Sequence, residues 1–284
     1  MIPDWEATGV FLADTLKVRH PDLFAQLHSL LTSHGVEIRL LNNVRDIWAR
    51  DFCPIQVGPG KLVRFRYGPD YLNEHREVRT GREVAQQFSG LEEILYSDIN
   101  LDGGNVVASR NKAIITDKVY RENPDWDRRK LRDELQRLLQ VQQLIVIPRE
   151  PYDLIGHADA MVRFIDEDTV LVNDYAEVDS PFGDRLVHAL RCQGLAIELV
   201  PYFHERRSTG GIPSAVGCFV NFLRTEKVVI VPAYGSKYDQ IALNRLKTLF
   251  SNVPVVSLDC TNLAREGGVL NCISAGFRYS PPSC

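Results

Sequence analysis

Short apolar runs alternate with amphipathic segments along almost the whole chain. The apolar runs are rich in Val and Ile, and several end at Pro, Gly or Asp, which is typical of β-strands. This pattern predicts ten strands, at 36–41, 61–67, 105–109, 113–117, 143–148, 160–166, 169–174, 196–201, 227–234 and 253–259. Strands that alternate with helices along the chain indicate an α/β fold.

The amphipathic segments repeat their apolar residues at the spacing of one helix face. In 20–35, for example, Leu23, Leu27 and Leu31 share a face, and the segment ends at Gly35. A Ser-Pro pair starts the segment at 180–194, as expected for a helix N-terminus. The predicted helices are 20–35, 80–89, 123–140, 180–194 and 236–252.

Strand-strand-helix-strand units recur at irregular spacing, around 36–98, 105–148, 160–200 and 227–273. No Pro/Gly/Ser-rich linker or run of charges divides them. We therefore predict a single α/β domain over residues 1–284, which is long enough to bury a core of its own.

Composition narrows the class of partner. The chain has 33 Lys+Arg against 37 Asp+Glu, a net charge of −4, and phosphate backbones attract basic surfaces, so nucleic acid is disfavoured. No apolar run approaches the roughly 18 residues of a membrane span. The N-terminus lacks the basic region of a signal peptide, so we expect a cytoplasmic protein without a membrane partner.

The six cysteines form no C-x-x-C pair and have no His at zinc-ligand spacing. We therefore expect reduced thiols, most of them buried as small apolar residues, and neither a metal nor a cofactor. They lie at positions 53, 192, 218, 260, 272 and 284.

Four polar clusters interrupt the pattern at strand ends or loops, where catalytic groups usually lie. They are 46–54, 101–107, 154–164 and 265–277. In the third, His157 and Asp159 are two residues apart, so an extended backbone would point both to one side. An isolated His-x-Asp pair is more often part of a solvated loop.

In the fourth cluster, Cys272 follows the pair Gly267–Gly268. A lone cysteine is most often a buried structural thiol, whereas a nucleophilic one needs partial exposure and a nearby base or cation. His157 is the candidate base. A glycine at 268 would let the backbone approach a substrate closely.

Together the clusters supply one Cys, one His and three carboxylates, Asp51, Asp102 and Asp159. This set suits a thiol that attacks the carbon of a cationic group held by carboxylates. The scattered Asp residues have no recognised metal-ligand spacing, and the glycine pairs match no nucleotide-binding motif.

In this order, the clusters resemble the agmatine deiminase / Porphyromonas-type peptidylarginine deiminase family. The family pattern W-x-R-D, [ED]-G-G-N, G-H-x-D and G-G-x-x-x-C matches 48–51, 102–105, 156–159 and 267–272. The opening 3–13 also resembles the family's P-x-W-E segment, so the resemblance spans nearly the whole chain. It implies the pentein fold, a five-bladed α/β propeller with one central site.

The resemblance also implies the roles of the central residues. Cys272 would attack the guanidinium carbon as a thiolate. His157 would protonate the departing ammonia and then activate water. Asp51 and Asp159 would pair with the guanidinium nitrogens. Asp102 would accept a hydrogen bond from His157.

Three further positions match the family around the substrate. Asn221 would lie near the substrate, Trp48 would form a wall of the pocket, and Gly268 would admit the substrate beside the backbone. The chain differs from agmatine enzymes at Asp102, where Glu is usual, and at Asn271, where His is common. The segment 203–218 also departs from the family pattern, and the chain is shorter than typical members.

The implied reaction hydrolyses a guanidine to a ureido product and ammonia without a cofactor. Agmatine, giving N-carbamoylputrescine for putrescine and polyamine biosynthesis, is the leading substrate by family majority. Three alternatives stay open: deimination of free, peptidyl or modified arginine, transfer of the amidino group to an amine, and a non-catalytic binding protein on the same fold. The expected partner is a small guanidino substrate, and a homodimer is left open.

Overall fold

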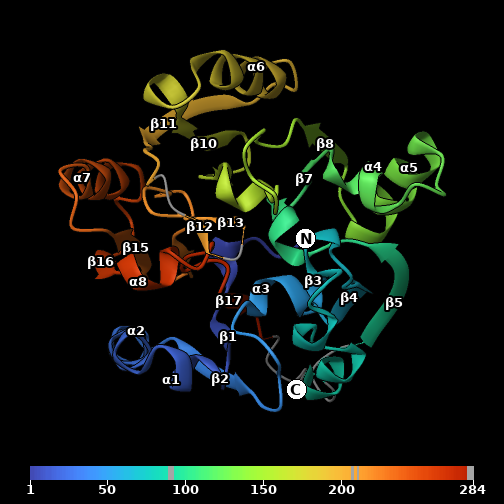
Figure 1. Cartoon of the computed structure of the whole chain (residues 1–284), viewed down its shortest axis with the longest axis horizontal. Helices are drawn as coiled ribbons and strands as arrows, with labels where there is room; N and C mark the ends of the chain where they lie inside the picture. The colour runs from blue at the N-terminus through green and yellow to red at the C-terminus, as the bar shows by residue number, and fades with distance from the viewer. Residues whose placement is uncertain (89–92, 206–207, 210, 280–284) are drawn as a thin grey trace.

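The computed structural model describes residues 1–88, 93–205, 208–209 and 211–279. Within them, five three-stranded sheets surround a central axis, and the longer helices lie on the outside of the ring (Figure 1). This is the α/β pentein architecture that the resemblance implied.

Every sheet has the same arrangement: its middle strand pairs antiparallel with one neighbour and parallel with the other. The sheets have the orders β17-β1-β2, β3-β4-β5, β6-β7-β8, β9-β10-β11 and β14-β15-β16, and β12-β13 is a short separate hairpin. The strands are β1 Gly9–Ala13, β2 Glu37–Leu41, β3 Ile55–Gly58, β4 Lys61–Arg66, β5 Glu93–Asn100, β6 Val107–Ala108, β7 Lys112–Thr116, β8 Gln143–Ile147, β9 Val162–Phe164, β10 Thr169–Asp174, β11 Ala196–Pro201, β12 Ser208–Thr209, β13 Ile212–Pro213, β14 Leu223–Arg224, β15 Val229–Ala233, β16 Val255–Asp259 and β17 Ser274–Phe277.

A helical crossover joins each middle strand to its parallel neighbour, because parallel strands cannot be connected by a tight turn. The α-helices are α1 Leu16–Arg19, α2 Pro21–Ser33, α3 Ala49–Phe52, α4 Lys118–Glu122, α5 Arg128–Leu139, α6 Ser180–Arg191, α7 Asp239–Leu249 and α8 Thr261–Ala264. The 3₁₀ helices are η1 Asp4–Glu6, η2 Asp70–Leu72, η3 Arg76–Val78, η4 Arg82–Phe88, η5 Gly103–Asn105, η6 Ala158–Ala160 and η7 Tyr175–Glu177.

All ten predicted strand segments contain an observed strand, and four predicted helices correspond to α2, α5, α6 and α7. The predicted start of α5 at residue 123 is wrong. The side chain of Asp127 accepts hydrogen bonds from the backbone N–H groups of Arg129 and Lys130, so this N-cap starts the helix at Arg128. The segment predicted as a helix at 80–89 forms the 3₁₀ helix η4; residue 89 lies outside the described residues.

The predicted unit 36–98 is also wrong, because it combines strands of two sheets. β2 pairs with β1, whereas β4 pairs with β3 and β5. The first sheet joins distant parts of the chain, since β17 pairs antiparallel with β1 from Gly9↔Phe277 to Leu12↔Ser274. A pattern of local units could not indicate this pairing, which closes the ring.

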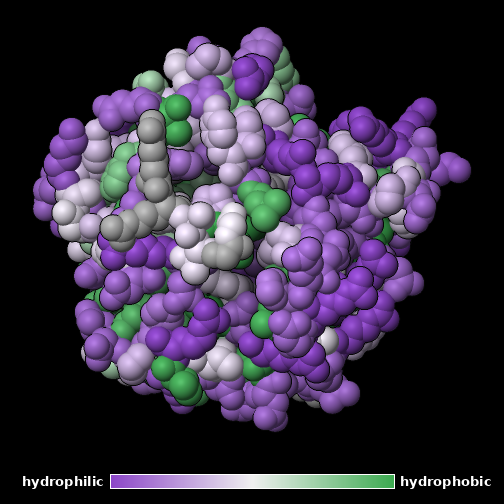
Figure 2. Space-filling model, in the orientation of Figure 1, coloured by the Kyte–Doolittle hydropathy of each residue, from purple (hydrophilic) through white to green (hydrophobic). Residues whose placement is uncertain are grey.

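The middle strands form the core of each sheet, while the outer parallel strands are partly exposed. All five residues of β1 are buried, whereas four of the five in β2 are not. The face seen in Figure 2 is mostly hydrophilic, with hydrophobic residues in small separate patches. No helix among the described residues is long and apolar enough to cross a membrane.

Candidate active site

The four polar clusters occupy equivalent places in the ring. α3 directly precedes β3, η5 precedes β6, η6 precedes β9, and Cys272 lies just before β17. Asn221 lies just before β14, so each of the five sheets supplies residues of the site from the segment that leads into its antiparallel outer strand. These segments contact one another at the centre: α3 touches η5 and β17, and η5 touches η6. The repeated architecture therefore brings together residues that are far apart in the sequence.

Cys272 is half-buried, and its sulfur contacts one side-chain amide and one carboxylate. The side-chain amide of Asn221 donates to Sγ over 3.3 Å. The Oδ1 of the same side chain accepts from the backbone N–H groups of Asn271 and Cys272, at 3.1 and 3.3 Å. Asn221 therefore fixes both the sulfur and the backbone that carries it.

Asp159 lies beside the sulfur, with Oδ2 at 3.8 Å from Sγ. Asn271 Nδ2 donates to this Oδ2 over 2.5 Å, and Asn271 Oδ1 accepts from Arg50 Nη2 over 3.0 Å. The other oxygen of Asp159, Oδ1, is buried and has no hydrogen-bond partner among the described residues. An unpaired buried carboxylate oxygen is costly, so Asp159 offers a strong acceptor to a cationic ligand.

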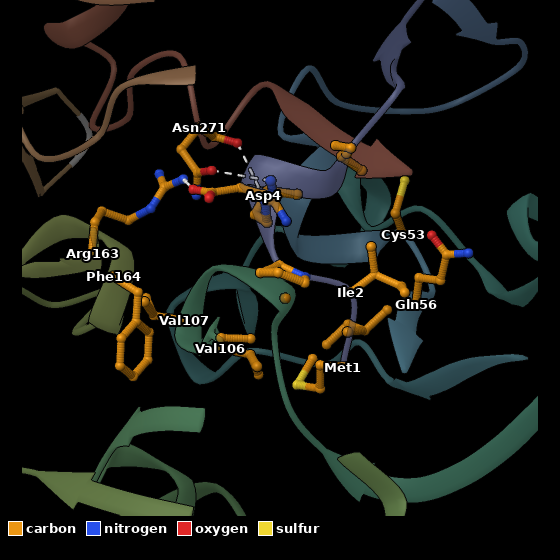
Figure 3. Close-up of a pocket in the computed structure, with 18 of the residues that line it drawn as sticks. Met1, Ile2, Asp4, Cys53, Gln56, Val106, Val107, Arg163, Phe164 and Asn271 are labelled. Atoms are coloured by element: carbon orange, nitrogen blue, oxygen red, sulfur yellow. Dashed lines mark hydrogen bonds and ion pairs between the residues drawn. The ribbon is translucent and has the colours of Figure 1, made fainter. Parts of the chain in front are cut away.

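Arg50 and Cys53 point away from the pocket that holds Cys272. Both line a separate cavity, in which Asn271 and the ion pair of Arg163 with Asp4 also appear (Figure 3). Cys53, the residue that follows α3, therefore lines this separate cavity and not the pocket that holds Cys272. Cys284 lies outside the described residues.

His157 is buried between two carboxylates, with 3% of its surface exposed. Its Nε2 is 2.9 Å from Asp102 Oδ2, and its Nδ1 is 3.5 Å from Asp51 Oδ1. The backbone N–H of Gly104 donates to the same Asp51 oxygen over 3.0 Å. A Cβ at position 104 would lie 2.6 Å from both Asp51 Oδ1 and His157 Nδ1, so this approach requires glycine.

The electrostatics of the site favour an imidazolium and a neutral thiol before a ligand binds. Burial alone would lower the pKa of His157, but the charge of Asp51 and the hydrogen bond that His157 donates to Asp102 outweigh it and raise the pKa to about 9. Burial raises the pKa of Asp51 to about 7. Burial, together with the charges of Asp159 and Asp51, raises the pKa of the Cys272 thiol well above its usual value.

A pocket of about 70 Å³ lies over these groups, and Trp48, Tyr67 and Tyr71 contribute aromatic rings to its wall. Trp48 lies in that wall as expected, and Gly268 explains its position: a Cβ there would be 2.5 Å from the Trp48 ring and 3.0 Å from Cys272 Cβ. The pocket residues are Asp46, Trp48, Asp51, Tyr67, Tyr71, Leu72, Asp153, Ile155, His157, Asp159, Ala160, Ile212, Glu266, Gly267, Gly268 and Cys272.

All eight predicted site residues therefore lie in or against one site. The sequence reasoning missed Tyr67, Tyr71, Asp153 and Ile155. Ile155 lies within the His157 cluster and Asp153 directly precedes it, so both could have been found there; the tyrosines follow β4 and carry no such signal. In the described part of the chain, no group of three His, Cys, Asp or Glu side chains is arranged to hold a metal ion.

A ring of five small α/β sheets with a Cys, a His and carboxylates at its centre defines the class of guanidino-group-modifying proteins with the pentein fold. The family model for the Porphyromonas-type peptidyl-arginine deiminase matches residues 13–277. The chain belongs to this family, a family of hydrolytic deiminases.

Individual relatives are distant. A Streptococcus mutans protein named provisionally as an agmatine deiminase is 22% identical over 287 residues, covering 87% of this chain and 77% of that protein. The agmatine deiminase of C. jejuni with substrate bound is 18% identical with a TM-score of 0.80, covering 99% of this chain and 96% of that one. A saxitoxin-pathway amidinotransferase from Microseira wollei shares the fold at a TM-score of 0.65, with 13% identity and coverage of 99% and 97%.

Proposed function

We propose that this protein hydrolyses the guanidino group of agmatine to N-carbamoylputrescine and ammonia, with Cys272 as the nucleophile. The observation that carries the proposal is the placement of two carboxylates, Asp51 and Asp159, beside one sulfur and one imidazole. A guanidinium between the carboxylates would meet the unpaired Oδ1 of Asp159 and place its carbon next to Sγ.

In the first half-reaction, the substrate cation offsets the charges of Asp159 and Asp51 that hold the Cys272 pKa high, which favours release of the thiol proton to solvent. The thiolate attacks the guanidinium carbon, and a C–S bond forms. His157 Nδ1 then donates its proton to one nitrogen of the tetrahedral adduct, the C–N bond breaks, and ammonia leaves. The product is a cationic S-thiouronium on Cys272 and a neutral imidazole.

In the second half-reaction, the neutral His157 takes a proton from water as the water oxygen attacks the same carbon. Collapse of this adduct breaks the C–S bond, and the hydroxyl proton of the adduct passes to the departing sulfur, so the neutral ureido product leaves beside a Cys272 thiol and an imidazolium. Over one cycle the guanidinium and water give the ureido product, ammonia and one proton, and His157 returns to its starting state without a cofactor. The joint retention of Cys272, His157, Asp51 and Asp159 supports this activity over a non-catalytic role.

The charges of the outer pocket support agmatine as the carrier of the guanidine. Besides Asp51 and Asp159, the described lining includes three carboxylates, Asp46, Asp153 and Glu266, and no Lys or Arg. Arg19 pairs with Asp46 and Glu266, whereas Asp153 accepts from the backbone N–H of Ile155 over 2.8 Å. Asp153 is therefore suited to a distal ammonium, while the carboxylate of free arginine would be repelled.

The proposal is tested by incubating purified protein with agmatine, free arginine and a peptidyl-arginine and measuring the ammonia and the ureido product that form. We expect the highest kcat/KM for agmatine. Asp153→Asn should lower that kcat/KM about tenfold, mainly through KM, because the lost interaction binds a part of the substrate remote from the reaction. Asp98→Asn, an exposed carboxylate on β5, should have no effect.

A higher kcat/KM for free arginine or peptidyl-arginine than for agmatine would contradict agmatine as the substrate, while the deiminase activity itself would still be supported. A transfer product that forms without ammonia when an amine acceptor is added would favour the amidinotransferase alternative. Failure of every guanidine to release ammonia or transfer its amidino group would contradict the proposed function.

A further inference from the structure

Lys118 is a buried lysine directly behind the site, and the reaction outlined above does not use it. It is the first residue of α4, and its side chain is only 1% exposed. Its Nζ lies 3.0 Å from Glu122 Oε1, 3.4 Å from Asp102 Oδ2 and 3.9 Å from Asp70 Oδ1. The ring of Tyr71 lies 4.7 Å from the same Nζ.

Lysine is rarely buried, because removing an ammonium from water is costly unless counter-charges compensate. Here burial alone would lower the pKa of Lys118, but the charges of Asp102 and Glu122 outweigh it, and the pKa is raised. Lys118 is therefore a fixed positive charge in the protein interior.

Asp102 is placed between this ammonium and the imidazole. Its Oδ2 is shared by Lys118 Nζ at 3.4 Å and His157 Nε2 at 2.9 Å. Its Oδ1 is buried without a hydrogen-bond partner among the described residues. Burial would raise the pKa of Asp102, but the hydrogen bond from His157 and the charge of Lys118 outweigh it, and the pKa is lowered.

We propose that Lys118 is a positioning residue for the acid–base step: its ammonium holds Asp102 as a carboxylate directed at His157 Nε2. That contact orients the ring so that Nδ1 faces Asp51 and the substrate. The effect on turnover rests on the proposed function, but the charge arrangement can be tested without any substrate.

The direction of the pH effect follows from the signs of the charges. A positive charge at Lys118 favours ionised Asp102 and disfavours protonated His157, so removing it raises the proton affinity of both groups. Activity that needs Asp102 ionised and His157 protonated then shifts to higher pH at both limbs. The other titratable groups around this network are Asp51, Asp70, Glu122, Asp153, Asp159, Tyr67 and Tyr71.

Lys118→Met removes the charge but leaves Glu122 and Asp102 as buried carboxylates without their cation, which risks misfolding. The double variant Lys118→Met/Glu122→Gln removes one buried positive and one buried negative charge, so the net charge of the buried network is unchanged. Glu122→Gln alone and Lys112→Met serve as controls; Lys112 lies on neighbouring β7 and pairs with Asp168, away from the site. Thermal melting establishes that each variant folds.

The first readout is the pH dependence of kcat at saturating guanidine. We expect the double variant to lose about tenfold to hundredfold in kcat, with KM nearly unchanged, because loss of a whole acid–base group is worth about 10²–10⁴. Both limbs of its profile should lie about one pH unit higher. Lys112→Met should retain the parent profile, whereas Glu122→Gln, which removes a negative charge that interacts with Asp102, should not move either limb to higher pH.

The second readout is ¹⁵N NMR of histidine-labelled protein, with His157 assigned by comparison with His157→Asn. In the double variant, the imidazole should titrate at a higher pH than in the parent. A folded double variant with unchanged limbs and unchanged His157 titration would overturn the inference, even with lower activity. Absence of turnover in the parent would contradict the proposed function, while the NMR titration would still decide the role of Lys118.

Discussion

The two sides of the central site are built from different chemistry. On the sulfur side, Asn221 and Asn271 hold Cys272 and Asp159 through neutral amide hydrogen bonds. On the imidazole side, ionised groups hold His157, with Asp102 at 2.9 Å and Lys118 behind it. The groups that hold them, Asn221, Asn271, Asp102 and Lys118, are all buried, so the difference between these groups lies in their charge.

This difference separates two tasks. Amides orient neighbouring groups without adding net charge, so the protonation of Cys272 stays responsive to a cation that enters the pocket. Buried ions fix a protonation state in advance, so His157 is an imidazolium before substrate arrives. The sulfur side thus allows Cys272 to lose its proton when a cation binds, whereas the imidazole side keeps His157 protonated until it donates that proton.

The largest effect should come from Cys272→Ala, which removes the nucleophile. We expect no ammonia release above background, although the guanidine should still bind, because Asp51 and Asp159 remain. Cys192→Ala, at the exposed end of α6, should keep nearly full activity. Equal losses in the two variants would show that the nucleophile is elsewhere.

A smaller loss of activity should follow substitution of Asn221, and two substitutions there separate its role in positioning Cys272 from the effect of its neutral charge. Asn221→Ala should lower kcat about tenfold to hundredfold, because Sγ and the backbone of Cys272 lose their common partner. Asn221→Asp should lose more, since a further negative charge would oppose thiolate formation. The pH dependence of kcat on the alkaline side, compared between the two variants, measures the effect of the added charge. Equal activity of Asn221→Asp and Asn221→Ala would contradict the argument that a neutral amide is needed beside the sulfur.

The smallest effect is the pH dependence of the unaltered protein. kcat/KM should be highest between about pH 7 and 9, the pKa values of Asp51 and His157 in the free protein. Below about 7, Asp51 gains a proton and loses its attraction for the guanidinium; above about 9, His157 loses the proton that it donates. Rates of agmatine hydrolysis across this range test it, and a maximum at pH 5 would break the assignment of charges.

Much of the fold and most of the site could be predicted because they depend on local pattern. The ten strands are short apolar runs, and the motifs around Asp51, Asp102, His157 and Cys272 follow one another in order. The pairing of β1 with β17 could not be predicted, because it joins distant segments through backbone hydrogen bonds that any residues can make.

Lys118 was missed for a different reason. In the sequence it begins a short helix among other charged residues, where a lysine normally faces water. Only the packing of η2, α4 and η5 around it shows that it is buried and placed behind Asp102. Tertiary placement, not residue type or spacing, distinguishes it from a surface lysine.

The junction of β1 with β17 also determines how the site can be lost. Cys272 directly precedes β17, whereas the other central groups belong to sheets that do not contain this junction. Detachment of β17 alone would carry the sulfur away from Asn221 and His157 while the remaining sheets kept their hydrogen bonds. Sub-global openings of this kind require less free energy than complete unfolding. Loss of the pairing between β1 and β17 would therefore inactivate the protein without melting the other four sheets.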